Sequence, residues 1–247
     1  MLILGIDTTT LSCSAALLRS GILLSEMTLN IKKTHSERLM PLIDCLLKES
    51  GIEREELKGI AVAAGPGSFT GLRIGLATAR ALAQGLAIPA VPVCTLSALA
   101  SAVPVPGFLI SPLLDARRSQ VYAALYERNP EPPYKLVNLI EPAARDLQDY
   151  LGDLKQYDRK VLFTGEGLNS YEKVLNEGFM ADHAVLAPPP FRLCRASFVA
   201  QCGRELLEQN PRSSYEELLP IYLRQSEAER LEKKKKAGKE GRQAEQN

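Results

Sequence analysis

The fold of this chain is decided by one glycine-rich segment, Gly65-Pro66-Gly67-Ser68-Phe69-Thr70-Gly71-Leu72-Arg73. It follows an apolar run over residues 59–64 and precedes a run of small and apolar residues over 74–83, so we predict a strand, a glycine turn and a helix. Glycines at such a turn let the backbone approach a ligand closely, and the N-terminus of the helix favours an anion. The spacing fits neither a Walker phosphate loop nor a dinucleotide fingerprint. A tight turn with close helix packing accounts for the same glycines, and both interpretations stay open at this point.

A second polar segment, Asp7-Thr8-Thr9-Thr10, follows the apolar run over residues 2–6. An acid beside hydroxyls at the end of a strand can hold a metal-bound phosphate, with the backbone amides binding phosphate oxygens. A turn capped by short polar side chains is an equally good interpretation. The first interpretation predicts a vestigial nucleotide site made of Asp7, Thr8, Thr9, Gly65, Gly67 and Ser68.

Apolar periodicity predicts the remaining elements. In the first half we expect strands over 2–6, 12–18, 22–29, 59–64 and 90–93, and helices from Thr34 to Gly51, over 74–83 and over 95–102. Thr34 and Glu37 have the spacing of a capping box, Pro41 predicts a kink or a later start of its helix, and Gly85 is expected to end the second helix. In the second half we expect strands over 108–114, 120–126, 135–140 and 161–164, and helices over 143–151, 169–177 and 194–209.

The order strand, strand, strand, helix, strand, helix occurs twice in this pattern, which predicts an α/β protein of two lobes with the same topology. The proline-rich stretch 103–107 is the best boundary between them. We therefore expect an N-terminal lobe over 1–103, a C-terminal lobe over 104–224 and a charged, disordered tail over 225–247. The consecutive lysines Lys233 to Lys236 fit a solvated tail better than a contact with nucleic acid or a partner.

Composition excludes some classes of protein. Thirty lysines and arginines stand against 29 acids, for a net charge of +1, so the chain has no global basic field for nucleic acid. None of the five cysteines forms a C-x-x-C pair, which argues against a disulfide framework and for a reducing compartment. The chain has no apolar run of about 18 residues and no basic leader before its first apolar run, so we predict a cytoplasmic protein without a membrane span.

Several segments together resemble the TsaB family, also called YeaZ. The resemblance extends from residue 1 to about residue 224, and the glycine-rich segment is its most diagnostic part. The matching segments are Ile3-Leu4-Gly5-Ile6-Asp7-Thr8-Thr9, Thr34-His35-Ser36-Glu37, 64–73, Leu114-Asp115-Ala116-Arg117, and Pro220 with Tyr222-Leu223-Arg224.

The resemblance implies the fold of actin, hexokinase and Hsp70, with two lobes of repeated topology. It also implies a role in making threonylcarbamoyladenosine on tRNA, as a non-catalytic scaffold that binds the catalytic subunit TsaD. A separate ATP-binding protein, TsaE, and an enzyme that makes threonylcarbamoyl-adenylate complete that system. The chain is expected to contact tRNA only indirectly and to form a homodimer when TsaD is absent.

Two positions argue against catalysis by this chain itself. Proteins like TsaD carry a His-x-x-x-His pair on one helix face, which can bind one metal ion. The corresponding positions here are Thr95 and Leu99, and the chain has only two histidines, His35 and His183. We therefore predict no catalytic residue, no metal and no cofactor. A metallopeptidase is disfavoured for the same reason, whereas an ATPase or nucleotide phosphotransferase of this fold remains the alternative function.

The helix that begins near Thr34 and the helix after Gly71 are the expected partner surface. By the family resemblance they pair with the equivalent face of TsaD, or with a second copy of this chain. Packing of both apolar stripes on their own sheet is the competing interpretation, and His35 can equally hydrogen-bond locally. The predicted interface residues are His35, Leu39, Met40, Ile43, Leu72, Arg73 and Ile74.

Overall fold

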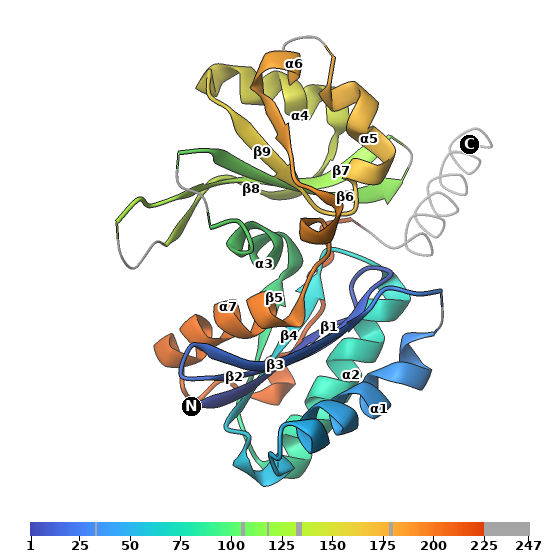
Figure 1. Cartoon of the computed structure of the whole chain (residues 1–247), viewed down its shortest axis with the longest axis vertical. Coiled ribbons are helices and arrows are strands. Elements are labelled where there is room, and N and C mark those ends of the chain that lie inside the picture. Colours follow the sequence, from blue (N-terminus) through green and yellow to red (C-terminus); the bar gives the residue numbers. More distant parts are fainter. Residues whose placement is uncertain (33, 105–106, 118, 132–134, 178–179, 225–247) are drawn as a thin grey trace, which may run out of the picture.

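The computed structural model describes residues 1–32, 34–104, 107–117, 119–131, 135–177 and 180–224. The predicted tail over 225–247 lies outside the described residues. The described chain forms two lobes, one above the other in Figure 1, and each is built on a five-stranded mixed sheet. This arrangement confirms the predicted α/β class and the two-lobed actin, hexokinase and Hsp70-like fold.

The first sheet has the strand order β3-β2-β1-β4-β5. Its central strand β1 is antiparallel to β2 and parallel to β4, because a hairpin joins β1 to β2 whereas helical crossovers lead to β4 and β5. The strands are β1 (Leu2–Asp7), β2 (Cys13–Arg19), β3 (Ile22–Leu29), β4 (Gly59–Gly65) and β5 (Ala90–Cys94).

The second sheet repeats this plan, with the order β10-β9-β6-β7-β8. Here β6 takes the place of β1, antiparallel to β7 and parallel to β9. The strands are β6 (Leu109–Arg117), β7 (Gln120–Arg128), β8 (Leu136–Asp146), β9 (Val161–Thr164) and β10 (Ala184–Leu186). Strand β10 was absent from our prediction, since its three half-buried residues are too few to show a period. The repeated unit is therefore longer than the predicted one by a strand and a helix.

The helices cover both sheets. They are α1 (His35–Glu49), α2 (Phe69–Leu86), α3 (Thr95–Ser101), α4 (Leu147–Leu154), α5 (Leu168–Leu175), α6 (Met180–His183) and α7 (Ala196–Gln209). Short 3-10 turns occur at Arg54–Glu56, Lys155–Tyr157, Pro189–Phe191 and Tyr215–Glu217.

The helices and sheets form five alternating layers (Figure 1). Helices α1 and α2 lie on the outer face of the first sheet, α3 and α7 lie between the two sheets, and α4 and α5 lie on the outer face of the second. Successive side chains of β1 point to opposite faces of the first sheet. Leu4 belongs to the core under α1 and α2, whereas Ile3 belongs to the core around α3 and α7.

The position of helix α7 does not follow the predicted boundary between the lobes. It lies within 104–224, yet it packs on β1, β2 and β4 of the first sheet, and Gly203 and Gly5 allow the close approach. A side chain at Gly203 would collide with Ala61, and one at Gly5 would collide with the backbone of Ala196. The residue ranges of the two lobes remain a prediction, but a division by residue number separates α7 from the sheet that it covers.

Three local predictions were wrong. The side chain of Thr34 makes no capping hydrogen bond, so no capping box exists at that helix start. The later helix start that Pro41 suggested is also wrong, since α1 begins at His35 and continues through Pro41, with its apolar stripe buried against the sheet. Helix α2 continues past Gly85 to Leu86, and Ala87 ends it in the left-handed conformation with φ 52°.

Candidate functional site

A cleft of about 950 Å³ lies between the two lobes, at the ends of β1, β4 and β6. Segments from both lobes line it, and most of them belong to the motifs singled out in the sequence. The lining residues are Thr9, Thr10, Leu11, His35, Gly67, Ser68, Phe69, Thr70, Leu114, Asp115, Ala116, Arg117, Tyr122, Glu166, Asn169, Ser170 and Arg224.

The two segments of the predicted nucleotide site are joined directly to each other. The backbone amide of Ser68 donates a 2.6 Å hydrogen bond to the carbonyl oxygen of Thr9. The hydroxyl of Thr8 donates a 2.7 Å bond to the carbonyl oxygen of Gly71. The structure therefore brings the predicted segments together, but their polar groups bind each other.

The glycines of the glycine-rich segment allow this close packing. A side chain at Gly67 would collide with the backbone of Thr9, and one at Gly71 would collide with the backbone of Thr8. A side chain at Gly75 would meet the hydroxyl of Thr8. Close packing of the turn and helix, one of the two open interpretations, thus has a direct structural reason at three positions.

Asp7 lies under the cleft, fully buried and outside its lining. Its Oδ1 accepts bonds from the Thr9 amide at 3.1 Å and from the Thr9 hydroxyl at 2.7 Å, which caps the turn after β1. Burial raises the pKa of Asp7 to about 7, because these bonds and the neighbouring Cys194 thiol offset only part of its desolvation and Glu166 adds repulsion. The side chain that would hold a metal-bound phosphate thus serves as a turn cap.

His35 joins α1 to the same region. Its Nε2 lies 3.0 Å from the carbonyl oxygen of Thr10, and its ring lies against Gly71. This is the local hydrogen bond that the sequence left open as an alternative to a partner contact.

The closing motif near residue 222 returns to the first lobe. The amide of Ile221 donates a 2.7 Å bond to the carbonyl oxygen of Ala64 at the end of β4. The Tyr222 ring stacks on Phe69 with centroids 5.5 Å apart, and the guanidinium of Arg73 lies 3.9 Å from the Phe69 centroid. Stacking and hydrogen bonding thus fix the C-terminal segment of the described chain at the N-terminus of α2.

Arg224 connects this segment to the second lobe. Its Nη1 donates a 2.6 Å hydrogen bond to the carbonyl oxygen of Ala116 in β6. The family motifs at 114–117 and 220–224, far apart in sequence, therefore meet at the cleft.

Glu166 is one of the cleft residues that the sequence analysis missed, along with Leu11, Tyr122, Asn169 and Ser170. It lies in the turn Gly165-Glu166-Gly167 between β9 and α5 and lines the cleft. Burial raises the pKa of Glu166, although its interactions with the side chain of Thr10 and the backbone of Leu11 lower it. A signal was present, since a Gly-x-Gly turn between a strand and a helix repeats the pattern of Gly65 and Gly67.

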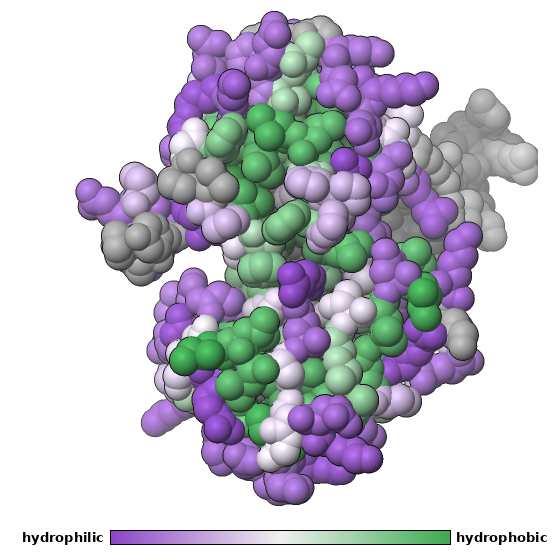
Figure 2. Space-filling view, in the orientation of Figure 1, coloured by the Kyte–Doolittle hydropathy of each residue, from purple (hydrophilic) through white to green (hydrophobic). Residues whose placement is uncertain are grey.

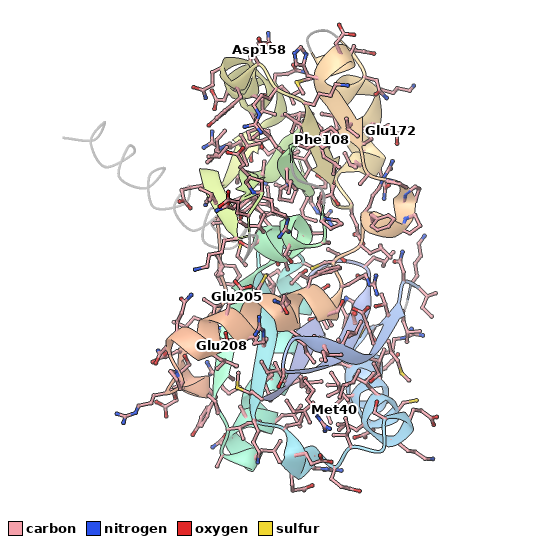
Figure 3. All side chains as sticks on the ribbon, turned by 60° about the vertical axis from the view of Figure 1, so that its left-hand side comes forward. Met40, Phe108, Asp158, Glu172, Glu205 and Glu208 are labelled. Carbon is pink, nitrogen blue, oxygen red and sulfur yellow. The ribbon has the colours of Figure 1, made fainter. Side chains whose placement is uncertain are left out.

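The predicted interface residues differ in exposure. Leu39, Ile43 and Leu72 are each 1% exposed and lie in the chain's own core, so they cannot contact a partner and are removed from the interface. Met40, labelled in Figure 3, is 37% exposed on α1. Arg73 is exposed, whereas His35 and Ile74 are half-buried.

The positions that correspond to a metal-binding histidine pair are buried. Thr95 and Leu99 lie on α3 in the core between the sheets, with 0% and 1% exposure. His183, on α6, lies 3.4 Å from Asp158 at the far end of the second lobe. Within the described ranges no three His, Cys, Asp or Glu side chains are grouped as metal ligands, and no helix has the length and apolar character to cross a membrane.

Comparisons with known proteins place the chain in a family. Residues 23–231 match the family model described as TsaD, tRNA N6-adenosine threonylcarbamoyltransferase. The tRNA threonylcarbamoyladenosine biosynthesis protein TsaB of Bacillus subtilis is 37% identical over 238 residues, which cover 93% of this chain and 96% of that protein. The protein of the same name from Escherichia coli is 36% identical over 131 residues, or 52% of this chain and 56% of that protein.

A solved structure agrees with these relatives. YeaZ from Pseudomonas aeruginosa superimposes with a TM-score of 0.73 at 25% identity, covering 90% of this chain and 99% of that one. The match extends over nearly the full length of both chains. The chain belongs to the TsaB family of tRNA threonylcarbamoyladenosine biosynthesis proteins and shares the domain of the wider TsaD family.

Proposed function

We propose that this chain is a non-catalytic scaffold subunit that binds a TsaD-like catalytic subunit and supports threonylcarbamoyladenosine formation on tRNA. One observation carries the proposal: the positions of a metal-binding histidine pair hold Thr95 and Leu99, and both are buried in the core between the lobes. A residue in that core can neither bind a metal in the cleft nor reach a substrate.

The exposed side of α1 and α2 is the proposed contact with the catalytic subunit. It is defined by Met40, Arg73, His35 and Ile74, the members of the predicted interface that keep some exposure. The inner sides of both helices are used by the first sheet, so only this outer side is available for a second chain. A homodimer in the absence of the catalytic subunit would use the same surface.

The remaining partners follow from this role. A TsaE-like ATPase joins through the complex of the two larger subunits, and tRNA is bound mainly by the catalytic subunit, because a net charge of +1 gives this chain no basic field of its own. We propose the cytoplasm as the compartment, where the tRNA substrate is found.

The alternative function, an ATPase or phosphotransferase, is not favoured by the cleft. The amides of Ser68 and Thr9, which a phosphate would need, already donate to Thr9 and Asp7. Glycines alone do not make a phosphate site when the donors beside them are used.

A reconstitution with one component left out tests the scaffold function. A TsaD-like subunit, a TsaE-like ATPase, the enzyme that makes threonylcarbamoyl-adenylate and tRNA are combined with and without this chain, and this chain is also assayed alone. We expect modified tRNA only in the complete mixture. Modification by this chain alone would exclude the non-catalytic assignment, and equal modification without it would exclude the scaffold.

A further inference from the structure

The last described segment of the chain, residues 218–224, returns to the first lobe after α7. Leu218 is buried at 1% exposure in the core of that lobe, and its carbonyl oxygen accepts a 2.9 Å hydrogen bond from Nη2 of Arg80 on α2. The amide of Ile221 donates a 2.7 Å bond to the carbonyl oxygen of Ala64 at the end of β4. The base of the segment is therefore fixed to the first lobe by burial and by hydrogen bonds to two elements.

The tip of the same segment reaches the second lobe. The Tyr222 ring stacks on Phe69 with centroids 5.5 Å apart, and its hydroxyl accepts a 3.5 Å hydrogen bond from Nε of Arg73. Two residues further on, Nη1 of Arg224 donates a 2.6 Å bond to the carbonyl oxygen of Ala116 in β6. One side chain of the tip thus holds α2 and the other holds the second sheet, so the two anchors act in series.

Helix α3 joins the two lobes by a different kind of contact. It packs on β4 and β5 of the first sheet and on β6, β7 and β8 of the second, and the hydroxyls of Ser97 and Tyr126 lie 3.0 Å apart. Next to it, Nε of Arg128 on β7 donates a 2.9 Å bond to the carbonyl oxygen of Val103. The cleft, by contrast, is lined mostly by polar side chains. Because a packed core resists rearrangement, movement of the lobes would pivot at α3 and change the width of the cleft.

We propose that residues 218–224 form an interlobe strap, which sets the width of the cleft by tying the N-terminus of α2 to β6. The base and the tip of the strap differ in burial, since Leu218 lies in the core whereas Tyr222 and Phe69 are 45% and 42% exposed. The tip therefore comes away at a lower cost than the base, and its release opens the cleft without unfolding either lobe. The strap is a property of the chain itself and does not depend on the proposed partner.

Electron paramagnetic resonance distances between two spin labels test the strap in the full chain. Glu37→Cys on α1 and Lys173→Cys on α5 place one exposed label on each lobe outside the cleft lining, and Cys45→Ser removes the exposed native thiol. The chain without the two added cysteines gives the background signal of the native thiols. Arg224→Met keeps the length of the side chain and removes its donors. We expect it to broaden the distance distribution and to shift its mean by more than about 2 Å, because the bond to β6 is lost.

Arg212→Met makes the same change at an exposed arginine that precedes the strap, and it is the matched control, with no shift expected. Tyr222→Ala releases the other anchor and should reproduce the distribution of Arg224→Met; it serves alone if that variant does not fold. Because the anchors act in series, the double variant should match either single one. An unchanged distribution in either single variant, an equal shift in Arg212→Met, or a wider opening in the double variant than in the single ones would overturn the strap.

Discussion

The hydroxyl of Thr8 donates a 2.7 Å hydrogen bond to the carbonyl oxygen of Gly71, and a side chain at Gly71 would collide with the carbonyl oxygen of Thr8. Gly71→Ala is therefore expected to lower the free energy of unfolding by about 3 kcal/mol, because the first loop and α2 must move apart. Urea denaturation monitored by circular dichroism measures the change.

Gly85, in the same helix, is the matched control for Gly71. A side chain there would meet nothing within 4 Å. Gly85→Ala should leave stability unchanged or raise it by up to about 1 kcal/mol, because alanine favours the helix and restricts the unfolded chain. Equal effects of the two substitutions would show that helix propensity, and not contact with Thr8, governs both positions.

Asp7→Asn should change how stability depends on pH. Burial raises the pKa of Asp7 to about 7 from the ordinary value of 3.8 for an aspartate, so between these values the folded chain holds a proton that the unfolded chain has lost. The stability contributed by protonated Asp7 is complete below about pH 4 and is lost as pH rises through about 7. The asparagine side chain does not titrate, so the variant does not lose stability in this way as pH rises.

Measurement at two pH values separates this effect from others. Urea denaturation should find the variant and the wild-type chain similar at pH 5, and the variant more stable at pH 8 by up to about 3 kcal/mol, because the wild-type chain loses about 1.4 kcal/mol per pH unit between pH 5 and about 7. The same difference between variant and wild type at both pH values would contradict an elevated pKa at Asp7.

Glu26 on β3 holds the start of α7. Its side chain is 6% exposed and accepts bonds from Arg195 and from both the amide and the hydroxyl of Ser197, at 2.9 and 2.7 Å for the latter two. Glu26→Ala should cost about 2 kcal/mol by thermal or urea unfolding, because it removes a helix cap and leaves the Ser197 amide unsatisfied.

Glu56 provides the comparison for Glu26. It forms an ion pair with Arg19 in which both side chains are about half exposed, at 48% and 49%. Glu56 also accepts a 3.0 Å hydrogen bond from the Glu53 amide at an exposed 3-10 turn. Glu56→Ala should cost less than about 1 kcal/mol, since both of these interactions are exposed to solvent. A cost at Glu56 as large as that at Glu26 would exclude burial as the reason for the difference.

Substitutions on the outer surface of α1 and α2 should change the affinity for a TsaD-like subunit. Met40→Asp should weaken binding of a TsaD-like subunit by at least about tenfold in calorimetry, because it places a charge in the proposed contact. Leu206→Asp on α7 is matched in exposure, 39% against 37%, but α7 lies on the opposite face of the first sheet. Equal binding by Met40→Asp and the wild-type chain would show that the contact does not include the outer surface of α1.

Exposed apolar residues are not confined to that surface. Figure 2 shows apolar residues on both lobes, interspersed with hydrophilic ones. The exposed residues of β3, with Ile22 at 68%, Leu23 at 43% and Leu24 at 42%, are a second set in the first lobe. Comparing Leu23→Asp with Met40→Asp in the same calorimetry would therefore distinguish a helix contact from an edge-strand contact.

The sequence by itself determined the order of elements and the family. The strands Ile22–Leu29 and Val161–Thr164 have the bounds that their patterns predict, because strand alternation and flanking turn residues are local properties. The motif at 64–73 identified the family for a similar reason, since its glycines are required by contacts that any sequence with this packing must preserve.

The tertiary structure alone decided which groups meet and which are buried. Periodicity places Leu39 and Met40 on one helix but does not say which of them the sheet covers. It cannot show that Glu166 and Leu11 line the same cleft, or that α7 covers the first sheet, because these arrangements bring together residues more than 100 positions apart. The pKa of Asp7 has the same origin, since desolvation depends on everything packed around the carboxyl and not on its neighbours in sequence.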